Sequence, residues 1–180
     1  MLSRISFLSA LTTCLALGAC GTGTVNYVQI DESYDPVQYR QLPYTGPIYT
    51  EVSGNPFAIA QPDLNLIVNA AVQPNGVPVS DGLGPRVHIA FGKTATDIHD
   101  ACTAAGTLGQ ADGKIAMTAA LCRGTDTAMT YLVASTDSVT DPHDPKFKAF
   151  LKQTVAQLFP NRNPNLPPDH GNNNCIIPGC

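Results

Sequence analysis

The residues best suited to chemistry in this chain are four potential metal ligands close together in sequence. They are two carboxylates, an imidazole and a thiol: Asp97, Asp100, His99 and Cys102. A transition metal bound there would need a neutral imidazole and a deprotonated thiol. If the chain is exported, the Cys102 thiol is expected to form a disulfide instead. We therefore expect neither a metal nor another cofactor.

Known catalytic motifs do not occur in the sequence. It contains no G-x-S-x-G, no S-x-x-K, no H-E-x-x-H and no phosphate-binding glycine loop. Glu32 and Glu51 are the only glutamates, and nothing pairs two acids as glycoside hydrolysis requires. His88 is expected to pack on a strand, and Asp144 beside His143 is better explained as a helix cap. We therefore expect no enzymatic activity.

The first twenty residues have the layout of an export signal. Arg4 is the only charge before a mostly apolar run that is too short for a comfortable bilayer span. The run ends in Leu17-Gly18-Ala19-Cys20, which resembles the lipobox of bacterial lipoproteins. The resemblance implies that residues 1–19 are a signal peptide and that Cys20 becomes the acylated first residue, carrying a thioether-linked lipid and palmitate or a similar chain.

Two alternatives remain open for this region. The signal could be an ordinary secretory one with an incidental cysteine, or Leu11-Thr12-Thr13-Cys14 could be the lipobox, although it lies inside the apolar run and has Thr before the cysteine. Gly21, rather than Asp, follows Cys20, which resembles the enteric pattern for the outer membrane. We expect a lipid-anchored, periplasm-facing protein, at the outer membrane rather than the inner.

Charge is sparse, and this limits the partners. Charged residues make up 13% of the chain and the formal net charge is −4. Nucleic acid requires a basic surface, so it is not expected as a partner. No apolar run after Cys20 could cross a bilayer, so the membrane is expected to be contacted through the lipid.

The remaining cysteines suggest disulfides. If Cys14 leaves with the signal and Cys20 carries the lipid, four cysteines are left, and three pairings are possible. The local pairings are preferred: Cys102 with Cys122, and Cys175 with Cys180.

Periodicity predicts one α+β domain over residues 48–160. Strands are expected at 48–52, 87–91, 114–122 and 127–135, and helices from Pro62 to before Pro74 and from Pro145 to Phe159. The β-α-β-β-β-α order favours a small antiparallel sheet covered by helices on one face. In the last strand, Met129, Tyr131 and Val133 are expected to share a side.

Segments without such periodicity flank the predicted domain. Residues 20–47 are interpreted as a tether with a reach of about 30 Å, and residues 161–180 as a disordered tail. The tether is rich in tyrosine, at Tyr27, Tyr34, Tyr39 and Tyr44. These rings either pack back on the domain or bind a partner.

Short motifs within the domain resemble a group of small proteobacterial lipoproteins. They are Gly54-Asn55-Pro56-Phe57, Leu121-Cys122-Arg123 and Asp144-Pro145-Lys146-Phe147 running to Leu158-Phe159-Pro160. The resemblance covers about residues 48–160 and implies a cysteine pair and a common domain. The expected function is a structural or protein-interaction module of the cell envelope. The alternative is a small-ligand pocket between the sheet and the 73–85 loop, lined by Phe57, Phe91 or Tyr131.

Overall fold

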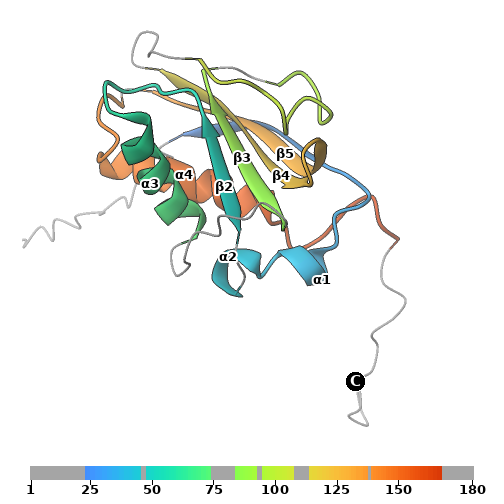
Figure 1. Cartoon of the computed structure of the whole chain (residues 1–180). Helices are drawn as coiled ribbons and strands as arrows, with labels where there is room; N and C mark the ends of the chain where they lie inside the picture. The colour runs from blue at the N-terminus through green and yellow to red at the C-terminus, as the bar shows by residue number, and fades with distance from the viewer. Residues whose placement is uncertain are drawn as a thin grey trace, which may run out of the picture.

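The computed structural model describes residues 23–45, 48–73, 84–92, 95–107, 114–137 and 139–167. These residues form an open five-stranded sheet with strand order β1-β5-β4-β3-β2 and a few helices (Figure 1). None of the helices in this part of the chain has the length and apolar character needed to cross a membrane. In chain order the elements are β1 (Thr24–Ile30), α1 (Pro36–Tyr39), α2 (Leu42–Thr45), β2 (Tyr49–Ser53), α3 (Gln61–Val72), β3 (Arg86–Phe91), β4 (Ile115–Arg123), β5 (Thr127–Thr136) and α4 (Pro145–Leu158).

The α+β class is confirmed, and the predicted helices and strands are all present. The expectation of a wholly antiparallel sheet is wrong for one pair, because β2 and β3 run parallel. The helix α3 lies between them in sequence and returns the chain to the same end of the sheet, so β3 starts where β2 started. The other three pairings are antiparallel.

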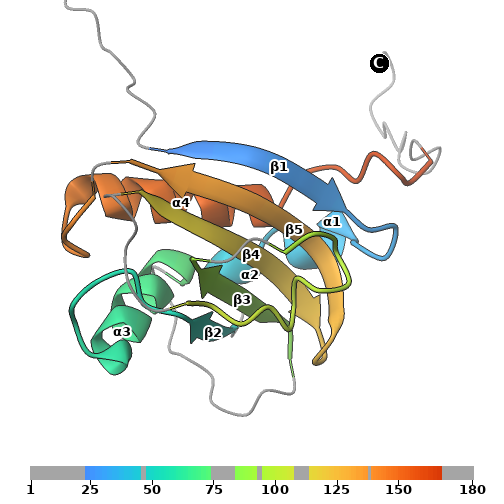
Figure 2. The same ribbon diagram turned by 90° about the horizontal axis from the view of Figure 1, so that it is seen from above.

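The predicted tether over residues 20–47 is wrong for its described part. Residues Thr24–Ile30 form β1, which runs beside β5 along one edge of the sheet (Figure 2). A register shift between Val25 and Tyr27 interrupts the alternation of side chains along this strand. Because a bulge breaks the period of two, the strand has no regular hydrophobic pattern in the sequence.

The main core lies between the sheet and helices α3 and α4. Helix α4 corresponds to the predicted helix from Pro145 to Phe159, and its large apolar side chains are buried. Asp144 caps the helix by accepting a hydrogen bond of 2.8 Å from the Lys146 N–H. The ring of Phe147 lies 4.9 Å from that of Phe57 and 6.1 Å from that of Phe91. Phe57 and Phe91 are therefore core residues packed against α4.

A bulge in the β4–β5 hairpin changes which β5 side chains lie together. Leu121 is opposite Thr130, but Cys122 is opposite Ala128, so Met129 falls in the register shift. Met129 consequently lies in the helix-side core, whereas Tyr131 lies on the other face with Val133. The expectation that these three residues share a side is wrong because the extra residue reverses the alternation at this point.

The ordered domain extends beyond residue 160. Asn163 is buried, and its Nδ2 donates to the backbone carbonyls of Asp31 at 2.7 Å and Tyr34 at 2.9 Å. The predicted tail is therefore wrong for residues 161–167, which are fastened to the segment after β1. Cys175 and Cys180 lie outside the described residues, as do the predicted signal peptide and Cys20.

Candidate functional site

The face of the sheet opposite the helices is covered by the segment 95–107. Small side chains on the sheet, Ala90, Ala120 and Ala128, allow the segment to approach closely and form a second apolar cluster with it. The predicted Cys102–Cys122 disulfide is confirmed and joins the segment to β4. This disulfide closes a sequence separation of 20 residues.

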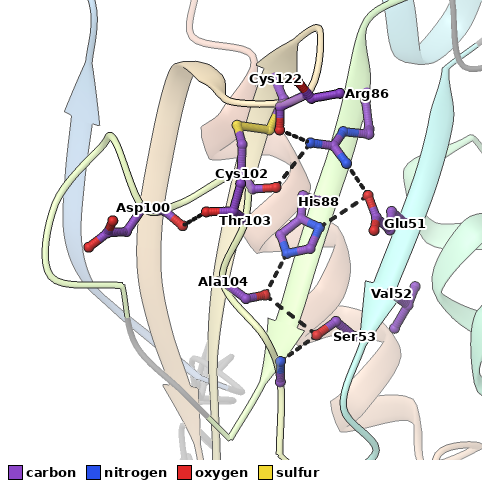
Figure 3. A network of polar contacts seen from close by, with 12 residues as sticks. Glu51, Val52, Ser53, Arg86, His88, Asp100, Cys102, Thr103, Ala104 and Cys122 are labelled. Carbon is purple, nitrogen blue, oxygen red and sulfur yellow. Dashed lines mark hydrogen bonds and ion pairs between the residues drawn. A yellow bond between two sulfur atoms is a disulfide. The ribbon is translucent and has the colours of Figure 1, made fainter.

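A polar network lies next to the disulfide, between β2, β3 and the covering segment (Figure 3). Glu51 on β2 forms an ion pair with Nη1 of Arg86 on β3. Nη2 of Arg86 donates to the carbonyls of Cys102 at 3.0 Å and of Thr125 at 2.6 Å. The guanidinium thus satisfies two backbone carbonyls and a carboxylate at once, as its fixed fork of donors permits.

His88 completes the network from the buried side. Its Nε2 lies 2.8 Å from the carbonyl oxygen of Ala104, so this nitrogen carries the proton, and its Nδ1 lies 3.5 Å from Oε2 of Glu51. Ser53 on β2 also donates to the Ala104 carbonyl, at 3.5 Å, and accepts from the N–H of Gly106.

The bonding pattern of this network is structural. His88 and Ser53 both bind the Ala104 carbonyl, so the imidazole is not placed to take a proton from the serine hydroxyl. His88 is also buried, with 3% of the residue exposed. Together the hydrogen bonds of Arg86, His88 and Ser53 hold the backbone of residues 102–106 against the sheet.

The residues between Asp97 and Cys102, considered above as possible metal ligands, form a turn. Oδ1 of Asp97 accepts the backbone N–H groups of His99 at 2.8 Å and Asp100 at 3.2 Å, and Cys102 is held in the disulfide. Among the described residues, no three His, Cys, Asp or Glu side chains lie together in a group that could hold a metal ion.

The four predicted partner-binding tyrosines separate into two pairs. Tyr34 and Tyr39 are core residues with ring centroids 5.9 Å apart, and the Tyr34 hydroxyl donates to the Pro160 carbonyl at 2.9 Å. Burial raises the pKa of the Tyr34 phenol. Of the two alternatives for these rings, Tyr34 and Tyr39 follow the first and pack back on their own domain, so the assignment of these two as partner-binding residues is wrong. Tyr27 and Tyr44 are exposed, at 49% and 65%.

The surface formed by α2, α3 and α4 contains two adjoining hollows, which we call the α3–α4 trough. Their volumes are about 500 Å³ and about 350 Å³, and both are lined by Ala71 and Lys152. The larger hollow includes Arg40 and Tyr44, and the smaller includes Leu66, His143 and Lys148. The shared residues make the two hollows one elongated depression.

The trough combines apolar surface with positive charge. Tyr44 and Leu66, one in each hollow, are large apolar side chains exposed at 65% and 67%. Arg40, Lys148 and Lys152 supply three of the chain's ten Lys and Arg residues, and no Asp or Glu is found among the described residues that line it. Lys148 and Lys152 are four residues apart, so they lie on one face of α4.

Sequence reasoning identified only part of this site. Tyr44 was considered as a binding residue, but nothing indicated that α2 and α3 would complete a trough beside Lys148 and Lys152. A usable signal was present in α4, whose fourteen residues contain three lysines and no acid. No protein-family model, curated protein or solved structure matches the chain.

Proposed function

We propose that this chain is a lipid-anchored protein-interaction module of the bacterial cell envelope, which faces the periplasm and binds a partner protein in the α3–α4 trough. The observation that carries the proposal is the combination, in one trough, of two exposed apolar side chains and a basic lining. Tyr44 and Leu66 would be the apolar anchors, and Lys148 and Lys152 the charged contacts.

Export is supported by two independent features. The lipobox-like Leu17-Gly18-Ala19-Cys20 is typical of lipoproteins, and the Cys102–Cys122 disulfide suits an oxidising compartment. The acyl chains on Cys20 would supply the membrane attachment, with the outer membrane favoured by Gly21.

The partner we infer presents an acidic amphipathic segment. The trough is long and open, which fits an extended or helical stretch of polypeptide. The trough has a basic lining, although the formal net charge of the chain is −4. An acidic partner would therefore find complementary charge in the trough that the chain as a whole does not offer. Its apolar side chains would pack on Tyr44 and Leu66.

The test is photo-crosslinking in native membranes. The full-length chain carries p-benzoylphenylalanine in place of Tyr44, with or without Lys148→Glu and Lys152→Glu together. We expect a crosslinked protein whose attached peptide is acidic, and a loss of at least about tenfold in its yield in the charge-reversed variant. Lys146→Glu is the matched control, because Lys146 is exposed on the same helix but does not line the trough.

Three outcomes would contradict the proposal. An equal loss in the Lys146→Glu control would show a general charge effect. A product of twice the mass of the chain would show self-association. A product with the added mass of a lipid or metabolite would favour the small-ligand function. Most of the 73–85 loop, one wall of the pocket first expected for such a ligand, lies outside the described residues. Phe57 and Phe91 pack in the core, and Tyr131 lies on the other face of the sheet.

A further inference from the structure

We propose that the lipid on Cys20 holds one particular end of the sheet, where β1 begins and β5 ends, directly against the membrane surface. The proposal rests on the lipidation of Cys20 proposed above. It replaces the expected tether of about 30 Å with a very short connection.

The chain is already packed against the domain at Gly23. A Cβ atom on Gly23 would lie 2.8 Å from Cε2 of Phe150 and 3.0 Å from the carbonyl oxygen of Ser135, so its backbone touches both α4 and β5. The next residue, Thr24, is paired with Ser135 in the sheet. Only Gly21 and Thr22 separate this fixed point from Cys20. The Cα atom of Cys20 therefore lies within roughly 11 Å of that of Gly23, even if the chain is fully extended.

The sheet register defines which residues share the anchored end. Ser135 is paired with Thr24 on one side and Ala116 on the other, and exposed Lys114 and Asp137 lie directly beyond these positions. The β4–β5 turn at residues 124–126 lies at the opposite end. Because Ile115–Arg123 contains eight residue spacings, the two ends are about 27 Å apart along β4.

The short connection also restricts where a partner can be. Phe150, beside Gly23, lies in the first half of α4, close in sequence to His143 and Lys148 of the smaller hollow. The larger hollow lies at the other end of α4, with Phe159 and Asn161. The trough therefore runs from the anchored end of the domain away from the bilayer. A partner that fills the trough would therefore reach the membrane surface at the end of the trough that contains His143 and Lys148.

Photo-crosslinking to lipid distinguishes the two ends of the sheet. Asp137 and Asp126 are a matched pair, because both are exposed aspartates next to β5. Asp126 directly precedes the strand, and Asp137 directly follows it. Each is replaced by p-benzoylphenylalanine in the full chain, which is then irradiated in vesicles of phosphatidylethanolamine and phosphatidylglycerol. We expect lipid adducts at position 137 at several times the yield found at position 126. A Gly-Ser linker of about 20 residues inserted after Gly21, with about 25 Å of reach, should abolish the difference.

The outcomes separate this inference from the proposal on which it rests. The lipid anchor itself is tested by labelling cells with a fatty acid. Absence of the fatty-acid label from the wild-type chain, or its retention in Cys20→Ala, would overturn the lipid anchor. Label that depends on Cys20, together with equal lipid adducts at both aspartate positions, would leave the anchor in place and overturn the short connection. Insensitivity to the inserted linker would also overturn it.

Discussion

Arg86 donates a 3.0 Å hydrogen bond from Nη2 to the backbone carbonyl of Cys102, the residue whose sulfur is bonded to Cys122. Cys122 is in turn the residue opposite Arg86 in the β3–β4 register. The covering segment is therefore held at one point by a covalent bond and by a guanidinium from the neighbouring strand. Each link can be removed separately.

Removing the disulfide should destabilise the domain. In Cys102→Ser/Cys122→Ser, we expect the free energy of unfolding to fall by about 3 kcal/mol, because the unfolded chain is no longer restrained by a loop of this length. Urea denaturation measures the change. Reductant should lower the stability of the wild type and leave the double variant unaffected; a wild type that is insensitive to reductant would contradict the prediction.

Removing the guanidinium should be costly as well. Arg86→Met withdraws the donor from the carbonyls of Cys102 and Thr125, and we expect a loss of about 2 kcal/mol, most of it from those carbonyls. The pair with Glu51 should add little, since the carboxylate side chain is 40% exposed and screened by solvent. Arg123→Met, at an exposed position on the next strand, is the control and should change stability by less than about 0.5 kcal/mol.

Gly106 is required by the close approach of the covering segment to β2. A methyl group there would overlap the Ser53 carbonyl and would lie 2.5 Å from the backbone nitrogen of Gly54. Because these are backbone atoms that cannot move aside locally, Gly106→Ala should cost about 2 kcal/mol and speed proteolysis of residues 95–107. Gly84→Ala has open space around it and should be nearly neutral. Equal effects at the two glycines would show that the close packing is not responsible.

Tyr34 should make the domain sensitive to alkali. Burial raises its pKa above the ordinary value of 10.0, so the folded state keeps the phenol proton at a pH where the unfolded chain loses it. The stability that Tyr34 contributes is thus fully present below its unfolded pKa and is lost as the pH rises above that value. Urea midpoints between about pH 8 and pH 11 should fall less steeply for Tyr34→Phe than for the wild type.

The same variant has a second expected effect. At neutral pH Tyr34→Phe should lose about 1 kcal/mol, because the hydrogen bond to the Pro160 carbonyl is removed. Tyr44→Phe is the matched control, since Tyr44 is exposed and the loss of its hydroxyl should leave the stability at neutral pH unchanged. A decline in Tyr34→Phe as steep as that of the wild type would assign the alkaline effect to other groups.

Asn163 should behave as a core residue although it follows the last helix. Asn163→Ala leaves the carbonyls of Asp31 and Tyr34 without their side-chain donor, and we expect a loss of about 2 kcal/mol by urea denaturation. Asn161→Ala, at an exposed position in the same segment, should be close to neutral. If both variants were neutral, residues 161–167 would not be part of the cooperative unit.

The sequence by itself determined the elements whose signals are local. The stripe of α4, its cap at Asp144 and the alternation in β3 and β4 all depend on neighbours within a few residues, so periodicity predicted them closely. The Cys102–Cys122 pairing was also preferred on sequence separation. The position of Cys20 in a lipobox is likewise a local pattern, and it remains a prediction.

Only the tertiary structure decided which segments join the sheet and which side chains meet. Thr24 and Ser135 are far apart in sequence, and the register shift in β1 removed the period that would have marked it as a strand. A single bulge between Leu121 and Cys122 separated Met129 from Tyr131. The trough arose in the same way, because Tyr44 and Lys152 come from different helices and only the tertiary fold places them around one hollow.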